Sequence, residues 1–237
     1  MEGFTLIDGI VAAVIVLSAI LAYSRGLVRE CMAIAGWVGA AILAFIFALR
    51  AEPLIKELPV VGAFLSDRDT PAPGSVVFAG MEGSRPVLTE IQELVAPSTL
   101  GTPRRTVVGV DSGRLSTILA VLEARCGIPF AGLDVFLNVA GGMRVSEPAA
   151  DLAIAGALLS AREDVAIPPD MVLFGEISLS GALRPASQTE NRLKEASKLG
   201  FSQATLPSRS KLGPSEGMRV RQMPDLTAFV GEMFGAG

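Results

Sequence analysis

Two long apolar runs at the start of the chain constrain its fold more than any other feature. Residues 9–24 and 31–49 carry no charged side chain, and about 20 helical residues are needed to cross the core of a bilayer. Only the second run is long enough by itself, and the first must recruit residues 4–7, which places Asp8 near the interface. The sequence therefore predicts a membrane α-helical hairpin of two spans, joined by the charged connection 24–30, where a glycine helps to break the helix.

The sequence changes character after residues 63–74. From there to residue 237 short β runs alternate with amphipathic helices at an ordinary charge density, and the mean hydropathy of +0.51 comes largely from the first 50 residues. Of the net charge of −4, residues 1–70 contribute five basic and seven acidic side chains, and the rest contribute fifteen and seventeen. We expect a two-span segment at 1–62, a linker or junction at 63–74 and a soluble domain at 75–237, with no polybasic nucleic-acid tail.

Missing residue types exclude several kinds of site. The chain has no histidine, so a Ser-His-Asp triad and the histidine-containing zinc-hydrolase motifs are excluded. Its two cysteines, Cys31 and Cys126, lie in different halves and form no CxxC pair. None of the four lysines follows a glycine, so the chain has no P-loop. We expect neither a metal site nor a cofactor.

The soluble part reads as interleaved strands and helices. Leu115, Ile118, Leu119 and Leu122 follow the spacing of a buried helical face. The predicted helices cover 114–125, 148–162, 189–199 and 224–234, and the predicted strands cover 75–79, 86–95, 105–110, 134–140, 171–177 and 203–206. This alternation indicates an α/β or mixed α+β class.

Several polar positions in the hydrophobic segment form a recognisable set. Asp8, Ser18, the connection 25–30 and the Gly36-Trp37 pair together resemble the colicin V production protein (CvpA) family over about residues 4–62. That resemblance implies an inner-membrane protein linked to colicin V (toxin) production or export, in a family that usually has about four spans. Only two spans are present here.

The orientation of this segment in the membrane is left open by its charges. Arg25 and Arg29 favour a cytoplasmic connection, whereas Arg50, Lys56 and Arg68 favour a cytoplasmic C-terminal side. We expect the inner membrane, with the C-terminal domain in the cytoplasm.

Two motifs in the soluble part resemble the protease-type domain of Lon, namely residues 136–142 and 174–185. A closer match, carried by residues 82–86, 90–92 and 146–153, is to the Lon-like C-terminal domain of the RadA family of DNA repair proteins. The resemblance covers about residues 72–237 and implies the ribosomal protein S5 domain 2-like fold.

Lon proteases use a serine nucleophile and a lysine base, and the resemblance places both positions in this chain. The serine position holds Ala149 and the lysine position holds Glu190, so we predict no peptidase activity. A substitute dyad of Ser146 and Lys194 would make the chain a Lon-like serine peptidase, a distant alternative. Ser146 is better interpreted as a helix N-cap, with Glu147 and Asp151 supporting the positive end of that helix.

The RadA resemblance implies a role in recombinational repair as a scaffold that forms homo-oligomeric rings and contacts DNA. The candidate DNA contacts are Arg85, Arg104, Arg105 and Arg114, which could neutralise phosphate without reading bases. We also expect the soluble domain to fold alone.

Two function classes therefore stay open: a nonenzymatic DNA-repair module with a membrane anchor, and a CvpA-type membrane protein with a passenger domain. Both resemblances are incomplete at one junction, which favours a recombined gene product over a repair protein that evolved with an anchor.

Overall fold

The computed structural model describes residues 6–57, 71–99, 101–213 and 217–235. The chain divides into two compact units, Met1–Leu58 and Pro59–Gly237. Most of the expected junction at 63–74 lies outside the described residues.

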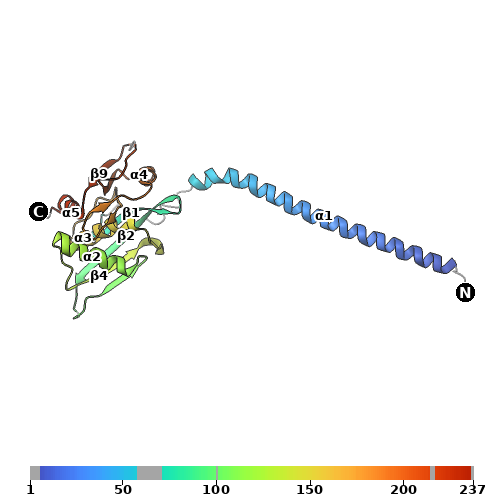
Figure 1. The fold of residues 1–237 in the computed structure, drawn as a ribbon, viewed down its shortest axis with the longest axis horizontal. Coiled ribbons are helices and arrows are strands. Elements are labelled where there is room, and N and C mark those ends of the chain that lie inside the picture. The colour runs from blue at the N-terminus through green and yellow to red at the C-terminus, as the bar shows by residue number, and fades with distance from the viewer. Residues whose placement is uncertain (1–5, 58–70, 100, 214–216, 236–237) are drawn as a thin grey trace. The chain divides into compact units, whose positions relative to one another are not determined.

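The first unit is a single helix, α1 (Leu6–Glu57), which continues through residues 24–30 (Figure 1). The predicted break in this connection is therefore wrong. Gly26 is its only glycine and costs about 1 kcal/mol relative to alanine, whereas the arginines, the leucine and the glutamate favour helix. No helix formed by the described residues is both long enough and apolar enough to cross a bilayer.

A mixed sheet of seven strands organises the second unit, in the order β3-β4-β2-β1-β5-β8-β9. The strands are β1 (Ser75–Glu82), β2 (Arg85–Pro97), β3 (Arg105–Val108), β4 (Leu133–Val139), β5 (Met171–Leu173), β8 (Gln203–Pro207) and β9 (Arg219–Met223). β1 pairs with β2 and β2 with β4 in antiparallel fashion, and the other four pairs are parallel. A separate small sheet joins β6 (Glu176–Ile177) to β7 (Leu183–Arg184).

Helices complete the core of this unit. They are α2 (Ser112–Cys126), α3 (Asp151–Glu163), α4 (Thr189–Lys198) and α5 (Leu226–Phe234), with short 3-10 turns η2 (Ala140–Gly142) and η3 (Pro148–Ala150). α3 lies across β1 and β2 and also contacts α2 and α5 (Figure 1). Every residue from 151 to 160 is buried. Gly156 allows this close approach, since a Cβ there would lie 2.7 Å from Leu173 Cδ1.

The predicted mixed α/β class is confirmed, with differences of detail. The strand expected at 171–177 divides into β5 and β6, because the chain leaves the main sheet at Phe174 and Gly175. β9 was not predicted. Its sequence Arg-Val-Arg-Gln-Met is mostly polar, and it forms an edge strand that needs only one neighbour.

The backbone of Gly74, just before β1, is hydrogen-bonded to both β2 and α3. The Gly74 N–H donates to Ser160 Oγ (2.8 Å), and the Glu93 N–H donates to the Gly74 carbonyl (2.7 Å). Gly74 has a φ of +84°, and a Cβ there would lie 2.1 Å from the Glu93 carbonyl oxygen, so only glycine fits.

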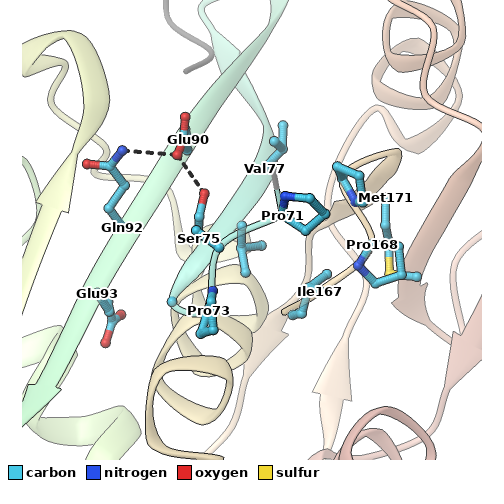
Figure 2. Close-up of a pocket in the computed structure, with 14 residues that line it drawn as sticks. Pro71, Pro73, Ser75, Val77, Glu90, Gln92, Glu93, Ile167, Pro168 and Met171 are labelled. Carbon is cyan, nitrogen blue, oxygen red and sulfur yellow. Dashed lines mark hydrogen bonds between the residues drawn. The ribbon is translucent and has the colours of Figure 1, made fainter. Parts of the chain in front are cut away.

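Residues 71–75 also form one wall of a small pocket (Figure 2). Ser75 Oγ and Gln92 Nε2 donate to Glu90 Oε1 at 2.5 and 3.0 Å, while Glu93 points the other way. The Glu93 side chain is buried, and neither carboxylate oxygen has a hydrogen-bond partner among the described residues. Burial holds the pKa of Glu93 well above its ordinary value.

We predict that Glu93 lowers the stability of the domain as the pH rises. The unfolded chain ionises Glu93 near pH 4.3, whereas the folded protein keeps the proton to higher pH, so the free energy of unfolding falls above about pH 4.3. Glu93→Gln removes this fall, so its advantage over the wild type grows from pH 5 to pH 8. Denaturant unfolding followed by circular dichroism measures the difference. Glu163→Gln, at a half-exposed carboxylate on α3, is the control, and an advantage for Glu93→Gln that is the same at both pH values would contradict the prediction.

Candidate functional site

The resemblance to Lon predicts the dyad at Ala149 and Glu190, of which the first is buried and the second is exposed. Ala149 is buried in η3, and its carbonyl accepts a hydrogen bond from the Gly175 N–H (2.7 Å). Glu190 is exposed in the first turn of α4, where its carboxylate lies against Gly213. The side chain at 149 offers no nucleophile, and the carboxylate at 190 faces another part of the surface.

Arg192 on α4 is buried and pairs with Glu147, two residues before Ala149. Its Nη1 donates to the Ala79 carbonyl (2.7 Å) and to Glu147 Oε2 (3.2 Å), and its Nη2 pairs with Glu147 Oε1. Its Nε donates to the Ser187 carbonyl (2.8 Å). The side chain is fully buried, and its guanidinium lies 5.6 Å from the ring centre of Phe174.

Glu147 completes this cluster from the segment before α3. Besides pairing with Arg192, its Oε2 accepts the Met81 N–H at 3.0 Å. The cluster therefore joins three parts of the domain: β1, the segment that leads into η3, and α4. Since the Glu147 carboxylate is held by these contacts, it is not free to support the positive end of α3 as predicted.

Ser146 lines a groove rather than capping a helix. The N-cap of η3 is Glu147 and that of α3 is Ala150, and neither makes a side-chain cap hydrogen bond, so the N-cap prediction for Ser146 is wrong. The 3-10 turn η3 displaces the start of α3 by several residues, which moves Ser146 away from its end. Lys194 is exposed on α4.

The groove lies between the start of α2, the segment 146–151 and the β6–β7 hairpin, with a volume of about 830 Å³. Arg114 Nη1 donates to Asp151 Oδ1 (2.5 Å), and the Ile177 N–H donates to Asp151 Oδ2 (3.1 Å). Burial raises the pKa of Asp151, and the hydrogen bond from Arg114 opposes that rise.

The charges of the groove do not favour a polyanion. Arg184 pairs with Glu176 at 3.1 Å, and Asp111 contributes a third carboxylate to the lining beside Asp151 and Glu176. Two arginines thus face three carboxylates. Arg114, a predicted DNA contact, is half-buried there and already paired.

Two further predicted DNA contacts hold the strand β4 in place. Arg104 donates from its N–H to Asp134 Oδ1 (2.7 Å) and from Nε to Oδ2 (3.2 Å), and the backbone hydrogen bond holds the pKa of Asp134 below its ordinary value. The Arg105 guanidinium donates to the carbonyls of Leu133, Phe130 and Arg104. Only the Arg104 side chain remains largely exposed, at 57%.

Arg85 is the predicted contact that makes neither an ion pair nor an internal side-chain hydrogen bond with a described residue. It is exposed, and it pairs in strand register with Glu82. Glu82 and Arg144 line the same small pocket beside the β1–β2 hairpin. Arg144 is likewise exposed and forms no ion pair within the described part of the chain.

Arg192 was missed in the sequence, although a signal for it was present. Thr189, Arg192, Leu193 and Ala196 follow the i, i+3, i+4, i+7 spacing and form the buried face of α4. An arginine on such a face requires a buried partner. The partner, Glu147, is 45 residues away in sequence, so spacing alone could not identify it.

Two family models match different parts of the chain. The family described as Colicin V production protein matches residues 7–79, and the family described as Subunit ChlI of Mg-chelatase matches residues 97–210. The first match extends into β1 of the sheet.

Curated relatives of the second unit are described as DNA repair protein RadA. The protein from Brucella abortus is 57% identical over 175 residues, which cover 73% of this chain and 38% of that protein. The protein from Aquifex aeolicus is 43% identical over 180 residues, covering 76% and 40%, and the one from Synechocystis is 43% identical over 175 residues, covering 74% and 35%. The chain thus spans about two fifths of the length of these relatives. Both resemblances drawn from the sequence motifs are confirmed.

We predict that the Arg192–Glu147 pair contributes strongly to stability. Arg192→Met leaves the Ala79 carbonyl and the Glu147 carboxylate without their buried partner and lowers the free energy of unfolding by about 3 kcal/mol. Arg192→Lys keeps the charge but loses the planar fork, so its loss is intermediate. Denaturant unfolding measures both, with Lys198→Ala, at an exposed lysine on the same helix, as a control within about 0.5 kcal/mol of wild type. Equal stability of Arg192→Met and the wild type would contradict the account.

Proposed function

We propose that this chain acts as a nonenzymatic module of the RadA type in recombinational DNA repair, attached to a membrane-associated helix. Its second unit would have the Lon protease-like fold and bind DNA without cleaving peptide bonds. The observation that carries this proposal is that Ala149, at the position where the resemblance predicts a nucleophile, is buried, and that Arg192 pairs with Glu147 two residues before it. Because the chain spans only part of its relatives, the repair role rests on similarity.

DNA binding by this module requires positive charge that is not already compensated. Arg104 and Arg114 each pair with a buried aspartate, and the Arg105 guanidinium donates to carbonyls. Arg85 and Arg144 are exposed and without ion pairs among the described residues; Arg85 begins β2, and Arg144 lines a pocket with Met81 and Glu82 of β1. We assign the principal phosphate contacts to these two, with Arg104 adding a weaker contribution.

Ring assembly belongs to the same proposal and rests on the RadA resemblance. The edge strands β3 and β9 each have a free side within the described sheet, which could meet a second copy.

Association of α1 with a lipid bilayer is supported by its surface. Val14, Ile15, Val16 and Leu17 are consecutive and about 60% exposed, so apolar side chains cover every side of the helix there. Trp37 and Phe47 are also exposed, at 81% and 75%. Exposure of this kind favours an apolar environment for α1.

The second candidate function is that of a CvpA-type inner-membrane protein linked to colicin V production, with the second unit as a passenger. The match of residues 7–79 to the Colicin V production protein family favours it. An effect of residues 1–62 alone on colicin export would support this alternative over the repair role.

We predict that the full chain, held in detergent, binds duplex DNA with a steep dependence on salt. Arg85→Ala and Arg144→Ala each reduce the slope of log affinity against log salt by about one, measured by fluorescence anisotropy between about 50 and 200 mM salt. Arg184→Ala is the matched control, because Arg184 is exposed but paired with Glu176 in the groove.

Two results would count against this proposal. Failure of the wild-type chain to bind at low salt would remove DNA as a ligand. Cleavage of casein that is lost in Ser146→Ala would establish a serine peptidase instead.

We predict that the full chain fractionates with membranes and stays there after washing with high salt, because apolar burial rather than charge holds α1 in place. Immunoblotting of membrane and supernatant fractions measures this. A variant with Val14, Leu17 and Phe47 all changed to Ser is expected in the supernatant, and its continued retention in the membrane fraction would contradict a role for the α1 surface.

A further inference from the structure

A second pair of cations without ion pairs to described residues follows the end of β8. Arg209 and Lys211 are both exposed and line one pocket of about 470 Å³ together with the start of α4. The α4 side of the pocket includes Gln188, Thr189, Glu190 and Asn191.

The turn that carries both cations is anchored to the sheet. The Ser208 N–H donates to the Met223 carbonyl (2.8 Å), and the Ser210 N–H donates to the Pro207 carbonyl (3.0 Å). Gln222 Nε2 donates to the carbonyls of Ser208 (3.3 Å) and Ser210 (3.2 Å). β9 therefore fixes the backbone on both sides of Arg209, which lowers the ordering cost of presenting this cation, and Lys211 follows Ser210 directly.

The lining residues of this pocket carry a net positive charge, and its two cations, Arg209 and Lys211, form no ion pair with a described residue. By contrast, Lys198 on α4 pairs with Glu195 on the same helix at 3.4 Å. Glu190 is the single carboxylate among the lining residues, so two cations face one anion. This is the reverse of the balance in the groove that contains Arg114.

We propose that the pocket lined by Arg209 and Lys211 binds a phosphate group of the DNA backbone. This deepens the proposed function and rests on it. The planar guanidinium of Arg209 suits bidentate contact with two phosphate oxygens, and the ammonium of Lys211 adds a point charge. Contacts of this kind position the duplex without reading its sequence. Glu190 repels the phosphate and limits the affinity of the pocket.

The full chain in detergent, titrated with a fluorescein-labelled duplex, tests this inference. Arg209→Ala and Lys211→Ala each weaken binding and reduce the salt slope by about one. Glu190→Gln changes affinity in the opposite direction and tightens binding, a result that a purely structural role for this carboxylate would not produce. Lys198→Ala removes a positive charge from the same helix outside the pocket and leaves affinity unchanged. Circular dichroism establishes that each variant is folded.

The outcomes separate this inference from the proposed function. Wild-type affinity in both Arg209→Ala and Lys211→Ala, together with a loss in Arg85→Ala, overturns the inference and leaves DNA binding at the hairpin standing. Absence of DNA binding by every form of the chain overturns both.

A second arm distinguishes DNA from a small phosphate compound. Lys211 is acetylated with a lysine-specific reagent in the presence of duplex DNA or of inorganic phosphate, and the modified fraction is measured by mass spectrometry. Protection by DNA at a low phosphate concentration supports the inference. Protection by inorganic phosphate without any by DNA overturns it in favour of a site for a free phosphate compound.

Discussion

The second unit depends most on the hydrogen bonds and the ion pair of the buried Arg192 guanidinium. The guanidinium donates to backbone carbonyls in β1 and before α4, and it pairs with Glu147 in the segment that leads to α3. A charged group that is fully buried is costly unless its donors are matched by acceptors. Here four hydrogen bonds match them, so the three segments are fixed relative to one another.

This arrangement has a direct consequence for chemistry. The segment that would carry a Lon-type serine is held by the Glu147 contacts, and its Ala149 is packed in the core. Glu190, two residues before Arg192, points instead to the surface near Gly213. The same helix thus contributes its buried face to the stability of the domain and its exposed start to a pocket with Arg209 and Lys211.

The sequence was sufficient to predict the elements whose signals are local. Helix α2 followed from the spacing of Leu115, Ile118, Leu119 and Leu122, and all four are buried. Features that depend on distant partners could not be predicted in this way. β9 has little apolar character of its own and forms because β8 offers a free edge. The helix α1 continues through Gly26 because the helix propensity of the neighbouring residues outweighs the small cost of one glycine. The charges of this connection had instead indicated a break.

Candidate site residues were harder to predict than the fold. The sequence does not show whether an arginine makes an ion pair or hydrogen bonds inside the folded domain. Arg104, Arg105 and Arg114 looked equivalent to Arg85, yet the first three make internal contacts. The resemblance to Lon predicts dyad positions at Ala149 and Glu190 but gives no information about Arg192, which is at neither of them.

Hydrogen–deuterium exchange of the full chain, with and without duplex DNA, tests the central claim that surface cations outside the predicted dyad positions bind DNA. The account predicts slower exchange on DNA binding at residues 82–87, 143–145 and 209–213. It also predicts no change along the groove at 111–118 and 176–184. Protection centred on that groove, or no protection anywhere in the second unit, would contradict it.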